Sequence, residues 1–253
     1  MAERFVASDG IGIVWHEWGS DAERPPVVLH HGFGAHAKLN WVGAGVVKAL
    51  TDAGRRVIAI DARGHGESDK PHDPAFYGED RMAKDLSELF DRLGLSQVDL
   101  VGYSMGAIVS LICATREPRL RRLVIGGVGD GILAQGGVDT RVVSNLDIVK
   151  ALLADDPADV PPSARGFRQL ADATGADRKA LAAQAQVVHA SRIPLEDIKV
   201  PALVLAGDND PLAARPERLA GAISGAQVRF APGDHRSVVA APQFVGAILE
   251  FLG

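Results

Sequence analysis

Cysteine is almost absent from this sequence. Cys113 is the only cysteine among 253 residues, so no internal disulfide can form and no cluster of thiolates is available for a metal. It lies in the apolar run Ile108–Ala114, where we expect a buried packing role. The cysteine content therefore excludes a disulfide scaffold and a cysteine-ligated metal site.

Long hydrophobic runs and strongly basic segments are also missing. No uninterrupted apolar stretch approaches the roughly 18 residues that cross a bilayer, and Met1–Phe5 shows no basic segment leading into an apolar one. We therefore expect a cytoplasmic protein with no membrane partner. The net charge is −5, and the densest basic cluster is only Arg119, Arg121 and Arg122. This charge balance argues against a nucleic-acid partner, which needs a basic surface.

Aromatic residues make up only 5% of the chain, whereas hydrophobic residues as a whole make up 47%. Small aliphatic side chains and glycine must therefore supply most of the core, a balance that suits helices packed closely on a sheet. The length is sufficient for one large domain or for two small ones.

Short apolar segments alternate with amphipathic segments along most of the chain. The predicted strands are Arg4–Ala7, Ile11–Trp18, Val27–His30, Val57–Ile60, Val98–Val101, Leu123–Ile125, Ala202–Ala206 and Val228–Ala231. The predicted helices span 41–53, 79–93, 215–223 and 241–252, and a further apolar helix ends near Ala114. This alternation predicts an α/β fold with a mostly parallel sheet and helices on both faces. The first two strands would form a hairpin that adds antiparallel strands at one edge.

One stretch, residues 130–194, lacks a recognisable strand. It is polar and rich in Ala and Asp, with helical pieces near 139–154, 163–174 and 177–190. A strandless insertion after a strand predicts a small helical lid over the catalytic edge of the sheet. The predicted core then comprises residues 1–129 and 195–253.

The segment Gly102–Gly106, with the sequence GYSMG, carries the strongest chemical signal. It follows a predicted strand and precedes a predicted helix, which is the context of a nucleophile elbow centred on Ser104. The flanking glycines keep side chains out of a tight, strained turn, and the start of a helix favours developing negative charge. We therefore predict that Ser104 is a nucleophile.

A serine nucleophile needs a base, and eight histidines compete for this role. We choose His235, which lies in a loop between the last short strand and the terminal helix. Such a loop at the carboxyl end of the sheet can reach the serine, and the chain order serine, acid, histidine is that of hydrolases with this elbow. His65 is the alternative base.

Three aspartates are candidates for the acid that orients the histidine. Asp208 and Asp210 directly follow the strand Ala202–Ala206, and Asp130 follows another strand. Asp210 is preferred because it lies further round the turn, where its side chain can aim toward His235. Asp208 would then bind nearby backbone amides. All three stay candidates at this point, because geometry decides the roles.

An oxyanion needs backbone N–H donors. The amide of Met105, directly after the serine, is one predicted donor. The amide of Phe33 is the other, because the glycine-rich segment His31–Gly34 follows an early strand. We expect Asp61–Ser68, with the sequence DARGHGES, to brace this loop through a buried polar network.

No motif indicates a metal or a cofactor. His30 and His31 are adjacent, but the chain has no H-E-x-x-H pattern and no cysteine cluster to complete a metal site. It also lacks the G-x-x-x-x-G-K-[ST] phosphate loop. We therefore predict no metal, no cofactor and a small-molecule partner.

Together these motifs resemble the α/β-hydrolase superfamily. The matching segments, which stand in the order of that family, are His31–Gly34, Asp61–Ser68, Gly102–Gly106, Gly207–Pro211 and Gly233–His235. The resemblance implies an eight-stranded sheet with a helical lid after the sixth strand, and it supports Asp210 as the acid. Short bacterial esterases and lactonases, including enol-lactone hydrolases and carbon–carbon bond hydrolases, are the most similar subgroup. Family dehalogenases and epoxide hydrolases carry Asp at the elbow, unlike Ser104.

The sequence therefore predicts a serine hydrolase that cleaves a carboxylic ester or lactone through an acyl-enzyme on Ser104. A carbon–carbon bond hydrolase or a cofactor-free perhydrolase could use the same residues. A non-catalytic ligand-binding receptor of the same fold is a third alternative, because a fold does not fix a function.

Overall fold

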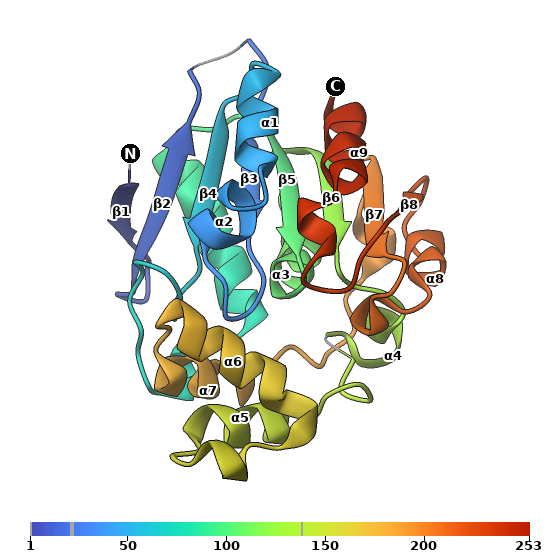
Figure 1. Ribbon diagram of the computed structural model, residues 1–253. Helices are drawn as coiled ribbons and strands as arrows, with labels where there is room; N and C mark the ends of the chain where they lie inside the picture. Colours follow the sequence, from blue (N-terminus) through green and yellow to red (C-terminus); the bar gives the residue numbers. More distant parts are fainter. Residues whose placement is uncertain (1, 21–22, 138) are drawn as a thin grey trace.

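The computed structural model describes residues 2–20, 23–137 and 139–253. The described residues form an eight-stranded sheet with the order β1-β2-β4-β3-β5-β6-β7-β8 (Figure 1). The strands are β1 Ala2–Val6, β2 Gly12–Trp18, β3 Val27–His30, β4 Val57–Asp61, β5 Val98–Tyr103, β6 Leu120–Gly126, β7 Ala202–Gly207 and β8 Gln227–Ala231. The β1–β2 and β2–β4 pairs are antiparallel, and the other neighbouring pairs are parallel. The predicted fold class, a mostly parallel sheet with an antiparallel edge, is confirmed.

Helices cover both faces of this sheet. They are α1 Val46–Asp52, α2 Glu79–Arg92, α3 Met105–Ala114, α4 Gly131–Gln135, α5 Asn145–Leu153, α6 Arg165–Thr174, α7 Arg178–Ala185, α8 Pro216–Gly221 and α9 Pro242–Leu252. Each face of the sheet has its own hydrophobic cluster. Helices α1 and α9 contribute to one cluster, and α2, α3 and α8 contribute to the other (Figure 1). Among the described residues, no helix combines the length and apolar character that a bilayer crossing requires.

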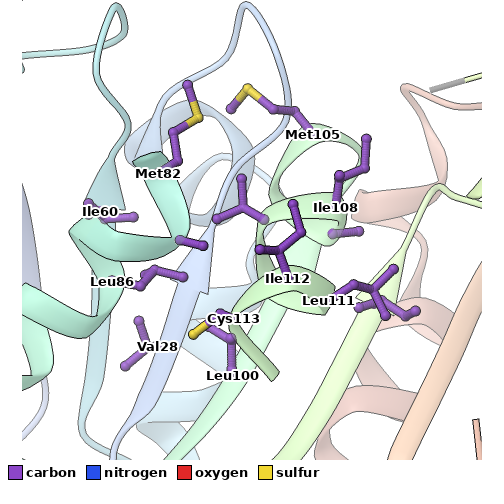
Figure 2. Packing of buried hydrophobic residues seen from close by; sticks show 14 of the residues in the cluster. Val28, Ile60, Met82, Leu86, Leu100, Met105, Ile108, Leu111, Ile112 and Cys113 are labelled. Carbon is purple, nitrogen blue, oxygen red and sulfur yellow. The ribbon is translucent and has the colours of Figure 1, made fainter. Parts of the chain in front are cut away.

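The packing of α2 and α3 shows how the apolar pattern becomes a core. Met82 and Leu86 are one turn apart on α2 and are fully buried. Figure 2 shows them on the same side of the sheet as Val28 and Leu100, with Cys113 of α3 beside them. Burial raises the pKa of the Cys113 thiol to about 12, which fits the expected packing role.

The predicted helix 41–53 is wrong as a continuous element. The structure instead has a π-helical turn at Lys38–Val42, followed by α1 at Val46–Asp52. Gly45 separates the two with a φ of 79°, a left-handed conformation that ends a right-handed helix. The apolar spacing indicates that the segment is helical and partly buried, but the break depends on the backbone of one glycine.

Strand β6 begins at Leu120, three residues before the predicted start at Leu123, because Arg121 and Arg122 interrupt the apolar pattern inside the strand. Arg121 ion-pairs with the buried Asp99 at 2.5 Å. Arg122 donates a hydrogen bond to the backbone carbonyl of Leu252 near the carboxyl terminus. These arginines interrupt the apolar pattern while their side chains bind neighbouring elements.

We call residues 130–194 the lid segment; Val138 within it lies outside the described residues. Its described part contains helices α4 to α7 and no strand, and α5, α6 and α7 lie beyond the carboxyl ends of the parallel strands (Figure 1). A third hydrophobic cluster belongs largely to this segment, with Ile148, Leu152 and Leu181 among its buried residues. The boundaries of the lid segment and its action as a lid stay predictions.

Candidate active site

Ser104 lies between β5 and α3 in a strained backbone conformation, with φ of 54° and ψ of −116°. Gly102 and Gly106 flank it, and at both positions another part of the backbone lies too close for a side chain. A Cβ on Gly102 would lie 2.2 Å from the carbonyl oxygen of Gly106, and a Cβ on Gly106 would lie 2.1 Å from that of His30. The backbone therefore tolerates no side chain at either position, and the turn presents Ser104 beyond the end of the strand.

His235 connects the serine to an aspartate from a different loop. Its Nε2 lies 2.9 Å from Ser104 Oγ, and its Nδ1 lies 2.8 Å from Asp210 Oδ2. These distances are suitable for an Asp–His–Ser hydrogen-bonded chain in which Nδ1 carries the proton and Nε2 faces the hydroxyl. The structure thus brings together the three side chains to which the sequence assigned chemistry.

The three candidate aspartates have different partners. The Asp210 side chain is fully buried, and its second carboxylate oxygen accepts a hydrogen bond from the Leu212 amide at 2.9 Å. Asp208 Oδ1 accepts from the Gly233 amide at 2.9 Å, which is the backbone contact expected for a turn residue. Asp130 is ion-paired with Arg215 at 2.5 Å. Asp210 is the candidate that contacts His235.

Tyr103 supports the histidine in a way that the sequence did not indicate. Its hydroxyl donates a 2.6 Å hydrogen bond to the backbone carbonyl of His235, and the two rings lie 5.3 Å apart between centroids. Burial holds the pKa of the Tyr103 phenol well above its usual range, so the hydroxyl keeps its proton as a donor. Tyr103 occupies a variable position of the elbow motif, so the motif itself gives no signal for this role.

The two predicted oxyanion donors lie in the wall of the same cavity as Ser104. Neither the Phe33 nor the Met105 amide donates a hydrogen bond to another described residue. The Phe33 ring packs against the lid segment, with its centroid 6.0 Å from that of Phe167. Both amides are therefore available to a ligand.

Side chains from two other elements hold the loop that carries Phe33. Asn40 Oδ1 accepts a hydrogen bond from the Gly32 amide at 3.0 Å, and His65 Nε2 accepts one from the Gly34 amide at 3.0 Å. His65 Nδ1 faces the backbone carbonyl of Arg63, and burial holds the pKa of this ring well below its usual value. Both ring nitrogens of His65 therefore have backbone partners. In this structure the alternative base holds the loop that carries Phe33 and does not contact Ser104.

Asp61 organises the predicted polar network from its centre. Its carboxylate accepts hydrogen bonds from the backbone amides of Ala37 and Glu67 and contacts His16 Nε2 at 3.1 Å. Although burial opposes ionisation, these contacts lower the pKa of Asp61 below its usual range. Potential ligand atoms of His16, Asp61 and Glu67 lie within 4.8 Å of one another. Glu67 pairs with Lys38 at 2.7 Å, so protein contacts account for this group, and the expectation of no metal stays a prediction.

A cavity of about 580 Å³ opens onto Ser104 and His235. This volume lies within the range of small-molecule sites. Most of its lining is apolar, including Phe167 from the lid segment. Glu79 is an exception: burial raises the pKa of its carboxyl to about 7.

Comparisons with known proteins agree with the observed fold. The family described as alpha/beta hydrolase fold matches residues 25–129. A solved hydrolase from Pseudomonas aeruginosa PA01 is 30% identical, with 100% of this chain and 98% of that chain covered and a TM-score of 0.78. The enol-lactonase from Burkholderia xenovorans LB400 is 24% identical, with 99% of both chains covered and a TM-score of 0.76, a similarity that concerns the fold alone.

A curated relative matches part of the chain. The 2-hydroxy-6-oxo-2,4-heptadienoate hydrolase of Pseudomonas putida (strain F1) is 38% identical over 138 residues, which are 54% of this chain and 48% of that protein. The chain spans about half the length of the curated relatives it matches. Because the likeness to the Pseudomonas aeruginosa hydrolase extends over the full length of this chain, the chain belongs to the α/β hydrolase fold family.

Proposed function

We propose that this protein is a serine hydrolase that cleaves a carboxylic ester or lactone bond of a small molecule. The observation that carries the proposal is the hydrogen-bonded chain from Ser104 through His235 to Asp210, with contacts of 2.9 and 2.8 Å. A serine hydroxyl becomes an effective nucleophile when an adjacent base can accept its proton. A fully buried carboxylate behind that base favours the imidazolium formed during attack.

The proposed reaction has two steps. In the first, His235 accepts the Ser104 proton as Oγ attacks the carbonyl carbon, and the amides of Phe33 and Met105 donate to the oxyanion. His235 then protonates the leaving alkoxide, and an acyl-enzyme remains. In the second step, His235 activates a water molecule, which attacks the acyl group and releases the acid and Ser104. No cofactor enters this scheme.

In the proposed function, the lid segment forms part of the substrate pocket. Phe167 and Leu170 of α6 line the cavity that contains Ser104. A helical cover at this position would shape the substrate pocket and limit the access of water. The apolar lining favours small organic esters or lactones as substrates.

Hydrolysis of p-nitrophenyl butyrate by wild type and Ser104→Ala tests the proposal. We expect the variant to lose at least about 10³-fold in kcat/KM, because it keeps the oxyanion donors and loses the nucleophile. Ser96→Ala, which changes an exposed serine in a surface loop, is the matched control and should retain wild-type activity. A fluorophosphonate probe should label Ser104, as mass spectrometry of the tryptic peptide would reveal.

Two outcomes would reject the hydrolase. Wild type could show neither turnover nor labelling, or Ser104→Ala could match wild type. Tight binding of small ligands without turnover would favour the receptor alternative. Formation of a peracid from acetate and hydrogen peroxide would favour the perhydrolase alternative.

The Pseudomonas putida relative favours a second candidate. Its named substrate, 2-hydroxy-6-oxo-2,4-heptadienoate, contains a ketone and no ester, so its hydrolysis breaks a carbon–carbon bond. We expect p-nitrophenyl butyrate to be the better substrate. A kcat/KM for the dienoate at least about 10-fold above that for the ester would assign carbon–carbon hydrolysis instead.

A further inference from the structure

Arg236 is a cation in the wall of the cavity, directly after His235 in the chain. Its side chain is exposed, and it lines the same cavity as Ser104 and His235. Among the described residues that line this cavity, Arg236 is the only lysine or arginine. The proposed mechanism gives this charge no role.

The guanidinium of Arg236 is held at the start of α6. Its Nη2 donates a hydrogen bond to the backbone carbonyl of Gly166, the second residue of that helix. A Cβ on Gly166 would lie 2.6 Å from this nitrogen, so the glycine allows the guanidinium to lie against the helix backbone. The arginine is therefore positioned by the lid segment and does not simply extend into solvent.

No carboxylate lies within ion-pair distance of Arg236 in the part of the chain that the structure describes. The nearest acid in sequence, Asp234, accepts hydrogen bonds from the backbone amides of Arg236 and Ser237 at 3.0 and 2.9 Å. The guanidinium contacts the Gly166 carbonyl instead. This contact uses one of the two Nη2 hydrogens. The Nε–H, both Nη1 hydrogens and the second Nη2 hydrogen have no acceptor among the described residues, and so they can bind a ligand.

The other charged groups in the cavity wall do not neutralise Arg236. Asp139 is bound by Arg141 through two contacts of 2.6 and 2.7 Å. Glu79 is almost fully buried and accepts a hydrogen bond from the His189 amide at 2.7 Å. Asp234 lies near enough to interact electrostatically with Arg236, but its carboxylate is bound by backbone amides and by Ser237. The cavity therefore has one positive group that forms no ion pair with a described residue. A guanidinium presents parallel N–H pairs that match the two oxygens of a carboxylate. Because Gly166 takes only one Nη2 hydrogen of Arg236, a parallel pair that includes the other Nη2 hydrogen remains for a carboxylate.

We propose that Arg236 binds a carboxylate group of the substrate, so that the preferred substrates are esters or lactones that also carry a free carboxylate. This inference rests on the proposed function, because it specifies the substrate of the same site. The carboxylate would bind beside His235 and orient the substrate, while the scissile carbonyl lies at Ser104. Arg236 is then a specificity residue.

Matched pairs of methyl esters test this inference. Each pair comprises the monomethyl ester of succinate, glutarate or adipate and the analogue in which a primary amide replaces the free carboxylate. The three chain lengths allow for the reach from Ser104 to Arg236. The measured quantity is the ratio of kcat/KM for the carboxylate to kcat/KM for the amide, followed by pH-stat at pH 7.5.

We expect wild type to prefer the carboxylate by at least about 10-fold for one or more chain lengths, mainly through KM. Arg236→Gln should bring this ratio close to 1. Added salt should lower the wild-type ratio, because the cavity is open to solvent and ions screen the pair. Arg192→Gln is the matched control: Arg192 is exposed, pairs with Glu196 and does not line the cavity, so the ratio should stay at the wild-type value.

A wild-type ratio of 1 or less at every chain length, or an unchanged ratio in Arg236→Gln, would overturn the inference. If wild type hydrolyses p-nitrophenyl butyrate in the same experiment, the proposed function stands and only the role of Arg236 fails. If wild type hydrolyses no ester, the proposed function fails. Calorimetric titration with adipate then decides about Arg236 by itself: a loss of affinity of about 10-fold or more in Arg236→Gln supports carboxylate binding, and equal affinity rejects it.

Discussion

Asp208 and Asp210 are two positions apart, yet their carboxylates face different groups. Asp210 is buried against His235 and the Leu212 amide, whereas Asp208 binds the Gly233 amide on the loop that carries the histidine. The first contact orients an imidazole, and the second fixes a loop. At the scale of single residues, the chemistry of a carboxylate depends on which partner the turn directs it toward.

This difference predicts unequal effects of the same substitution. Asp210→Asn should lower kcat for p-nitrophenyl butyrate by about 10² to 10⁴-fold, because an amide N–H would face Nδ1 and favour the wrong tautomer. Asp208→Asn is the matched control and should cost less than about threefold, because an amide oxygen can still accept from Gly233. Steady-state kinetics of both variants measure the contrast. A larger loss in Asp208→Asn would assign the acid role to Asp208.

A sequence can indicate candidate residues that stand in fixed motifs, but it gives no signal for residues that contact the site from variable positions. Ser104 and His235 stand in recognisable turns at the ends of strands. Tyr103, Asn40 and Arg236 contact the same site, but each occupies a position where many residue types are compatible with the local fold. Their roles depend on the tertiary arrangement, which brings a hydroxyl, an amide and a guanidinium to the site from separate segments.

Elements with a clear apolar period were the easiest to predict. The spacing of Met82, Leu86 and Leu89 located α2 to within one residue at its end. The start of β6 and the division of the helix at Gly45 were missed, because they depend on long-range ion pairs and on one left-handed backbone conformation. An apolar pattern predicts which face of a helix or strand is buried, but it predicts poorly where the element has polar ends or where it is interrupted.

Helix α6 offers a test at the scale of an element. Gly166 has an ordinary helical environment except for the Arg236 guanidinium, so Gly166→Ala should raise the free energy of unfolding by up to about 1 kcal/mol. Its Cβ should also displace the guanidinium and lower the ratio of kcat/KM for carboxylate over amide substrates. Urea unfolding and the matched ester pairs measure the two effects.

Gly246→Ala is the control for that substitution. Gly246 lies in the interior of α9, and a Cβ there would meet no atom within 4 Å. We expect a similar gain in stability with an unchanged substrate ratio. Equal ratios in both variants would mean that α6 does not position Arg236.

At the scale of the whole molecule, neutral histidines are buried between the sheet and the loop that carries Phe33. Burial lowers the pKa of His30 to about 3 and the pKa of His65 well below its usual value, and it also lowers the pKa of His31. In the unfolded chain these rings would bind protons near pH 6.5. The folded state therefore requires His30, His31 and His65 to be uncharged.

The free energy of unfolding should consequently fall as the pH drops below about 6.5, because the unfolded state then binds more protons than the folded state. His30 alone accounts for about 2 kcal/mol between pH 6.5 and 5, and His31 and His65 act in the same direction. Glu79 opposes the trend, since its folded pKa of about 7 exceeds its ordinary value of 4.5 and adds stability as the pH falls through this range. Burial also lowers the pKa of His36, which acts with the other histidines, and raises the pKa of Asp85, which acts with Glu79. We expect a net loss of stability, because four histidines act against two carboxyl groups.

Urea unfolding at pH 7 and pH 5 measures this loss. His65→Gln keeps an acceptor for the Gly34 amide and cannot be protonated in this range, so its stability should depend less steeply on pH than that of wild type. Equal stability of wild type at the two pH values would show that the histidine cluster is not titrated by unfolding.

The contact between the Phe33 and Phe167 rings joins two parts of the molecule that have different tasks. Phe33 carries a proposed oxyanion amide, and Phe167 belongs to α6 of the lid segment. An outward movement of α6 would withdraw support from the amide at the same time as it widened the entrance. Substrate entry and bond cleavage would then occur in different conformations. In the open conformation Ser104 would lack full oxyanion stabilisation, and the rate of closure would limit turnover.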